Sequence, residues 1–206
     1  MSVEELKKEP LTVILVLINV LVFLAVELTG GSDNTVHMLQ CGAAYTPAVL
    51  EGEYYRLFTC MFLHFGVQHL LNNMLLLFVL GGRLERTMGK IKYLLIYILG
   101  GIGGNLLSFL MECKTGEYAV SAGASGAIFA IMGAMIYAVL RGRGRIEDLS
   151  TRQIIIMAVL SLYFGFTSSG VDNAAHVGGL LSGFLLAVIL YHPHMSAGRN
   201  TEKTEP

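Results

Sequence analysis

The chain has 206 residues, of which 54% are apolar and 14% are charged, and its mean hydropathy is +0.62. This composition excludes a disordered chain and an ordinary soluble globule, and it indicates a membrane protein. The net charge of -1 and the lack of a basic stripe with interleaved aromatic residues give no sign of a nucleic-acid partner. We therefore predict an all-α fold, a polytopic bundle of membrane-spanning helices.

Six apolar segments approach the roughly 17 to 25 residues that a helix needs to cross a bilayer. They are 11–28, 70–84 with a start extended toward His69, 93–111, 124–140, 154–166 and 174–191. The second and fifth are short for a full crossing. We interpret the first as an uncleaved span and not as a signal peptide, because its apolar run is long and no Ala-x-Ala-like site follows closely.

The basic residues indicate the orientation of these spans. Twelve of the fourteen Lys and Arg residues lie before the first span, after the sixth, or in the connections between spans two and three or four and five. Only Arg56 and Lys114 lie on the other side. The positive-inside rule then predicts a multi-pass cell-membrane protein with both termini in the cytoplasm. The expected divisions are a cytoplasmic segment 1–10, a six-span domain 11–191 and a cytoplasmic tail 192–206.

The first outer connection, from 29 to about 68, is too long for a simple turn. It carries six aromatic residues: Tyr45, Tyr54, Tyr55, Phe58, Phe62 and Phe65. This load predicts a segment that is partly helical and partly embedded in the membrane interface, and the alternative is an aromatic belt without a functional role. Three cysteines, Cys41, Cys60 and Cys113, fall on or near the outer face, so either at least one is unpaired or all three are reduced.

The fourth and sixth spans each carry a stripe of small residues. The stripes are Gly126, Ala130 and Gly133 on the fourth span and Gly179, Gly183 and Ala187 on the sixth. Small residues let transmembrane helices approach closely, which predicts a close contact between these two spans. His176 shares the face of Gly179 and Gly183, so that contact would carry it to Ser125, at the start of the fourth span.

A serine becomes a strong nucleophile when a neighbouring base accepts its proton, and a Ser-His pair meets this need. A lone Ser125 in the run Gly-Ala-Ser-Gly is more often a packing residue. The matching position of His176 favours catalysis instead. A third, orienting carboxylate is not evident, since Asp172 is placed to cap the sixth span. We therefore predict a dyad, with the ring of Phe129 against His176.

Polar residues at the start of the second span bear on the same chemistry. His69 and Asn73 lie four residues apart and share a helix face. Together with the backbone N–H of Ser125 they are candidates to stabilise the oxyanion of acyl transfer. The alternative is that they cap the helix or face the headgroups.

Other hydrolytic motifs are missing from the sequence. It contains no His-Glu-x-x-His run, and its remaining histidines His37, His192 and His194 are scattered between both faces, so we expect neither a metal nor a cofactor. The Gly-x-Ser-x-Gly motif is also absent, because Gly126 directly follows the serine.

Five motifs, in order along the chain, resemble those of rhomboid intramembrane serine proteases. They are EYYRLFT at 53–59, HFGVQHLLNN at 64–73, GGRLE at 81–85, GASG at 123–126 and AHVGG at 175–179. The resemblance covers about residues 10 to 191 and corresponds to the six-span basic bacterial form. It implies Ser125 as the nucleophile, His176 as the general base, His69 and Asn73 as oxyanion donors, and transmembrane proteins as substrates, cleaved near their outer ends.

The chain departs from the family pattern at two positions. Tyr55 stands before Arg56 where the family often has tryptophan. Phe129 stands where the family often has tyrosine, and phenylalanine keeps the aromatic ring but lacks the hydroxyl. The alternative function is that of an inactive relative that binds transmembrane clients. A channel or transporter is disfavoured because no charged residue lies in the middle of a span. Neither the substrate nor the oligomeric state follows from the sequence.

Overall fold

A computed structural model of the protein describes residues 8–141, 145–146, 149–167 and 170–191. The described chain is an all-α helical membrane protein in which one pair of two-residue strands connects α9 to α10. The elements are α2 Pro10–Thr29, α3 Thr35–Gln40, α4 Thr46–Leu50, α5 Arg56–Thr59, η1 Cys60–Phe62, α6 Gly66–Leu76, η2 Leu77–Gly81, α7 Gly82–Met88, α8 Lys90–Thr115, α9 Ser125–Arg141, β1 Arg145–Ile146, β2 Leu149–Ser150, α10 Thr151–Thr167 and α11 Asn173–Leu190.

Three helices, α2, α8 and α11, are long and apolar enough to cross a membrane on their own. A fourth span results if Arg56–Phe62 and Gly66–Met88, which are bent by 91°, are counted together. The apolar helices α9 and α10 are shorter, with 17 residues each. At 1.5 Å per residue, α8 is about 39 Å long and α9 only about 26 Å.

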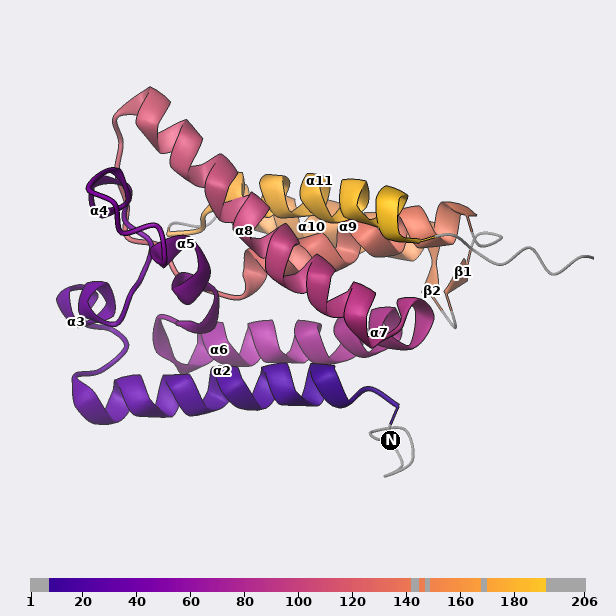
Figure 1. Ribbon diagram of the computed structural model, residues 1–206, viewed down its shortest axis with the longest axis horizontal. Helices are drawn as coiled ribbons and strands as arrows, with labels where there is room; N and C mark the ends of the chain where they lie inside the picture. Colours follow the sequence, from indigo (N-terminus) through magenta and orange to yellow (C-terminus); the bar gives the residue numbers. More distant parts are fainter. Residues whose placement is uncertain (1–7, 142–144, 147–148, 168–169, 192–206) are drawn as a thin grey trace, which may run out of the picture.

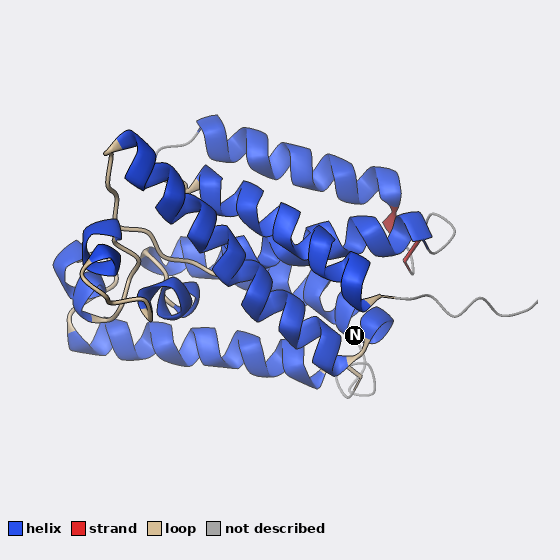
Figure 2. Ribbon diagram, turned by 45° about the horizontal axis from the view of Figure 1, so that its top comes forward, coloured by secondary structure: helices blue, strands red, loops and turns tan. Residues whose placement is uncertain are grey.

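The long helices run roughly along one direction (Figure 1). Helices α2 and α6 lie on one side, α9, α10 and α11 lie on the other, and α8 crosses obliquely in front of α9 and α11. The N-terminal end of α2 and the C-terminal end of α11 share one end of the molecule with α7 and the two strands, whereas α3, α4 and α5 gather at the opposite end (Figures 1 and 2). The described chain thus begins and finishes at the same end of the bundle.

Backbone-to-backbone contact between α9 and α11 forms the centre of the bundle. A Cβ atom added to Gly183 would lie 1.9 Å from the carbonyl oxygen of Ala130, and one added to Gly179 would lie 2.1 Å from that of Gly126. Twelve of the seventeen residues of α9 are buried, so this helix is the most enclosed. The close contact that the small-residue stripes predicted is confirmed.

Helix α8 joins this centre through glycines that the sequence analysis did not use. A Cβ on Gly100 would lie 2.3 Å from the Cβ of Ala130, and one on Gly104 would lie 2.5 Å from the carbonyl oxygen of Ala175. The helix ends where Gly116 adopts a left-handed conformation with φ 74°, which a residue with a side chain rarely takes. The three most closely packed helices are therefore α8, α9 and α11.

The second predicted span, 70–84, proves to be part of a longer helical run from Gly66 to Met88. Its middle, η2, is a wider π-helical segment. Beyond it, the carboxylate of Glu85 accepts hydrogen bonds from the N–H groups of Leu11 and Thr12 and from the Thr12 hydroxyl. These N–H groups begin α2 and have no acceptor within that helix, so Glu85 anchors its N-terminus.

The outer connection contains four short helical segments, α3, α4, α5 and η1, so the prediction that it is partly helical is confirmed. Arg56 holds it together by donating hydrogen bonds to the carbonyl oxygens of Leu39, at 2.7 Å, and Ala43, at 2.8 Å. The guanidinium also pairs with Glu53 at 2.6 Å. Hydrogen bonds from Tyr55 and Arg56 lower the pKa of the Glu53 carboxyl below its ordinary value.

The glycine contacts predict an asymmetry between two substitutions. Gly183→Ala places a methyl group against the Ala130 carbonyl and should lower the free energy of unfolding by about 1 to 3 kcal/mol, the usual range for overpacking. Gly126→Ala is the matched control, because its methyl group would meet nothing closer than 3.6 Å. Thermal denaturation in detergent measures both. Equal melting temperatures for Gly183→Ala and wild type would show that the two helices are not in backbone contact.

The Glu53 contacts predict a pH dependence of the outer connection. Because the pKa of Glu53 is lowered in the folded protein, its stabilising effect is full above the ordinary value of 4.5 and is lost as the pH falls through the lower, folded value. Amides of 39–59 should therefore exchange faster in Glu53→Gln than in wild type at pH 6, with the two converging in stronger acid. Glu51→Gln, at an exposed neighbouring carboxylate, is the control. Identical exchange at pH 6 would contradict the prediction.

Candidate active site

Ser125 and His176 face each other across the α9–α11 contact. Ser125 is the first residue of α9, and His176 lies in the first turn of α11. The Ser125 Oγ and His176 Nε2 atoms are 2.8 Å apart, a hydrogen-bond distance. His176 is only 7% exposed, whereas Ser125 is half-buried. An imidazole in this position can take the hydroxyl proton as the serine oxygen attacks a carbonyl carbon.

Phe129 stacks on the His176 ring, as the sequence analysis predicted. The ring centroids are 4.4 Å apart and the ring planes differ by 19°. Phe129 lies one turn after Ser125 on α9 and is itself buried. The histidine ring is therefore held by packing from the helix that carries the serine.

Asp172 caps α11, and its hydrogen bonds are to Ala175 and Ser108 and not to His176. One of its carboxylate oxygens accepts the N–H of Ala175 at 2.8 Å, and the other accepts the Ser108 hydroxyl at 2.6 Å. The cap that the sequence predicted is confirmed. The Nδ1 atom of His176 is buried and has no hydrogen-bond partner among the described residues. The structure thus holds a serine and a histidine in contact without an orienting carboxylate.

Gly123, two residues before the serine, is required by both its conformation and its surroundings. Its φ of 145° lies in a region that L-residues rarely adopt. A Cβ atom there would lie 2.9 Å from the His69 ring and 3.7 Å from the Ser125 oxygen. The loop before α9 therefore packs directly against His69, which brings this predicted residue to the serine.

Asn73 is placed less directly. Its side-chain amide donates to the carbonyl oxygen of His69, one turn earlier on α6, at 3.2 Å. The residue is 5% exposed and shares the face of His69, as its spacing predicted. In this arrangement one of its two amide N–H donors is engaged within its own helix.

The backbone before Ser125 is anchored by two hydrogen bonds. The N–H of Gly123 donates to the carbonyl oxygen of Cys60 at 2.9 Å, and that of Ala124 donates to Nε2 of His64 at 3.4 Å. His64 is 1% exposed, and sequence reasoning assigned it no role. Because Ser125 begins α9, its own N–H lies among the unpaired donors of a helix N-terminus, where the helix dipole favours negative charge.

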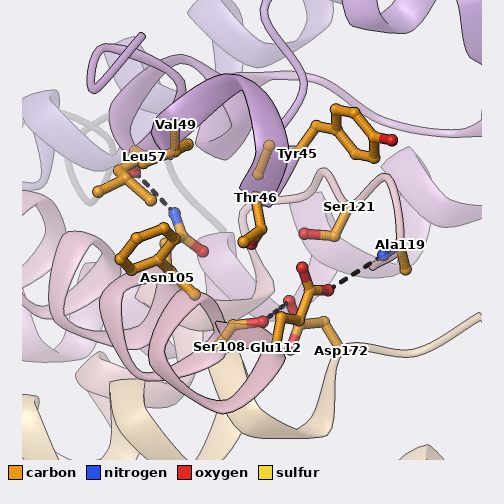
Figure 3. Close-up of a pocket in the computed structure, with 12 residues that line it drawn as sticks. Tyr45, Thr46, Val49, Leu57, Asn105, Ser108, Glu112, Ala119, Ser121 and Asp172 are labelled. Atoms are coloured by element: carbon orange, nitrogen blue, oxygen red, sulfur yellow. Dashed lines mark hydrogen bonds between the residues drawn. The ribbon is translucent and has the colours of Figure 1, made fainter. Parts of the chain in front are cut away.

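A small polar pocket lies beside this loop (Figure 3). On α8, Asn105 donates to the carbonyl oxygen of Leu57 at 2.8 Å, while Glu112 accepts the N–H of Ala119 at 3.2 Å. With the bond from Ser108 to Asp172, these contacts tie α8 to the loop before α9 and to the start of α11. No role was predicted for Asn105 and Ser108 from the sequence, although polar side chains within an apolar span are a recognisable signal.

The side chains that could bind a metal ion do not form a cluster in the described part of the chain. Among the described residues, no three His, Cys, Asp or Glu side chains lie close enough together to hold a metal ion. Cys41, Cys60 and Cys113 are all free thiols. The sequence left open whether two of them pair, and in the structure no disulfide joins them.

Comparison with known proteins agrees with this arrangement. Residues 51–193 match the Rhomboid domain. Over 190 residues, 92% of its length, the chain is 38% identical to Rhomboid protease GluP of Bacillus subtilis and covers 36% of that protein. It is 41% identical to RHOMBOID-like protein 5 of Arabidopsis thaliana over 79% of the chain and 52% of that protein. It is also 37% identical to Putative rhomboid protease YdcA of Bacillus subtilis, over 70% of the chain and 71% of that protein.

The chain thus spans between about a third and a half of the length of the first two relatives. The matched region contains Ser125, His176, His69 and Asn73, together with the loop and helix contacts that surround them. On the extent of this match, the chain belongs to the rhomboid family of intramembrane proteases.

Proposed function

We propose that this protein is an intramembrane serine endopeptidase that cleaves transmembrane segments of other membrane proteins near their outer ends. The observation that carries the proposal is the 2.8 Å contact between Ser125 Oγ and His176 Nε2, held between two tightly packed apolar helices. Family membership and the likeness to rhomboid proteases support the same activity.

In this proposal, residues 11–191 form one protease domain that crosses the membrane six times. The helical run α6–α7 and the 17-residue helices α9 and α10 supply the crossings beyond α2, α8 and α11. Both ends of the domain lie in the cytoplasm, flanked by the segments 1–10 and 192–206. Two observations support this orientation: α2 begins and α11 ends at one end of the bundle, and most basic residues flank that end.

Ser125 acts as the nucleophile and His176 as the general base. The histidine accepts the serine proton as the acyl bond forms and then returns it to the leaving amine, as in other serine hydrolases. Stacking on Phe129 supplies the orientation that a third carboxylate gives in a triad.

The oxyanion is stabilised by the N–H of Ser125 and by the side chains of His69 and Asn73. The backbone donor comes from the positive end of α9, and His69 lies against the same loop through Gly123. Asn73 contributes the amide N–H that does not donate to the His69 carbonyl. The substrate must unwind locally to present a carbonyl, because a transmembrane helix hides its carbonyls in its own hydrogen bonds. We therefore expect small or helix-breaking residues at the cut.

The rival function is that of an inactive relative that binds transmembrane clients without cutting them. It requires the same fold but no contact between a nucleophile and a base. The hydrogen-bonded Ser125–His176 pair favours the protease.

The first test concerns the dyad. Ser125→Ala and His176→Ala should each reduce cleavage of a model transmembrane substrate to background while leaving the protein folded, and the double variant should be hardly worse than either single one. Ser182→Ala, at another serine in an apolar helix, is the control and should keep full activity. Products that persist in Ser125→Ala would overturn the assignment, and a wild-type protein that binds the substrate without cutting it would support the rival.

The second test concerns the oxyanion donors. Asn73→Ala should lower the cleavage rate by roughly 10²- to 10³-fold if it supplies one full donor, or by less if His69 and the Ser125 N–H share the charge. Its melting temperature should change little. The neighbouring Asn72 is exposed, so Asn72→Ala is the matched control. A loss of stability in step with activity, or an unchanged rate, would return Asn73 to a structural role.

A further inference from the structure

An open-sided apolar groove of about 540 Å³ lies between α2, α8 and the segment formed by α5 and η1. Ile18 and Val22 of α2 line one wall, and Leu94 and Ile98 of α8 line the other. Phe58 and Phe62 close it on the side of the outer connection, with their rings packed edge to face at 5.3 Å. No part of the proposed protease mechanism uses this space.

Water is a poor occupant of the groove. Its lining has only two polar side chains, Cys41 and Thr59. The Thr59 hydroxyl already donates to the carbonyl oxygen of Gly42 at 2.7 Å, and the Cys41 sulfur lies 3.5 Å from Nε2 of His37. A buried water usually needs two to four polar partners, and the groove offers only this hydroxyl oxygen and a weakly polar sulfur.

The position of the groove, between helices long enough to span a membrane, favours a hydrocarbon occupant. Its two walls are helices of membrane-spanning length, and neighbouring side chains on the same helices, such as Leu21 at 63% and Leu99 at 46%, are exposed. From Leu15 to Val22 the wall extends for about 10 Å along α2. The groove is thus elongated and opens on the surface that meets the lipid tails.

The segment Arg56–Phe62 connects this groove to the candidate active site. It is bent by 91° from the following helical run, and three of its residues, Phe58, Thr59 and Phe62, line the groove. Phe58 and Phe62 face the groove, while the carbonyl of Cys60, between them, accepts the N–H of Gly123 in the loop before Ser125. What fills the groove therefore supports the backbone that holds this loop.

We propose that the groove is a binding site for one acyl chain of a membrane phospholipid, which supports the Arg56–Phe62 segment from below. The chemistry that recognises it is a hydrocarbon wall on membrane-spanning helices, with only two polar side chains in its lining. This proposal concerns lipid binding and stands whether or not the chain is an active protease.

The protein has no tryptophan, so a single introduced one reports on its own surroundings. Phe62→Trp places the reporter in the groove, and Leu99→Trp places a matched reporter on the open lipid-facing surface of α8. In vesicles of a phosphatidylcholine with brominated chains, both should be strongly quenched. After transfer to detergent with only a few brominated lipids per protein, Leu99→Trp should recover its fluorescence while Phe62→Trp stays quenched. Ile98→Trp serves as a second groove reporter if Phe62→Trp does not fold.

A filling substitution completes the test. Ile18→Phe, added to Phe62→Trp, should abolish the quenching that persists in detergent, whereas Ile14→Phe, one turn earlier on α2 and outside the groove lining, should not. Two results would overturn the proposal. One is a groove reporter that is unquenched in pure brominated vesicles, which would mean that the groove is closed to lipid. The other is a reporter that recovers in step with Leu99→Trp, which would mean contact with bulk lipid only.

Discussion

The structure depends on the contact between the backbones of α9 and α11. At this contact the carbonyl oxygens of Gly126 and Ala130 occupy the space where Gly179 and Gly183 lack side chains. Glycine within a helix costs about 1 kcal/mol relative to alanine, and here the cost is offset by packing that no larger residue permits. Because two rigid backbones touch, little freedom remains between the helix starts that carry Ser125 and His176. The histidine ring needs only Phe129 to complete its placement.

Much of this arrangement followed from the sequence, because the residues that carry it lie at fixed spacing along each of two helices. The stripes of small residues predicted the contact, and the position of His176 on the glycine face predicted that it would meet Ser125. The Asp172 cap followed from residue type and place. Such features depend on helical periodicity and chain order, which a sequence contains explicitly.

Other features could not be predicted, because they join residues that are distant along the chain and belong to different elements. Nothing local to Glu85 indicates that it would cap α2, and nothing local to His64 indicates that its ring would accept the N–H of Ala124. The glycines of α8 are visible in the sequence, but their partners on α9 and α11 are not. The limits of the second span were missed for a different reason: polar residues at its start concealed a helix that begins at Gly66.

The π-helical segment η2 allows the run from Gly66 to Met88 to contact two different parts of the protein, the loop before Ser125 and the start of α2. A π turn contains one residue more than an α turn, and one extra residue rotates everything beyond it by about 100° around the helix axis. The part of the run before η2 can thus turn His69 and Asn73 toward the loop before Ser125, while the part after η2 turns Glu85 toward the start of α2. In a uniform helix a single angular offset would tie these two faces together. The π-helical turn thus sets the angle between the two faces of the run. Deletion of one residue there would separate either His69 and Asn73 from the loop before Ser125, or Glu85 from the start of α2.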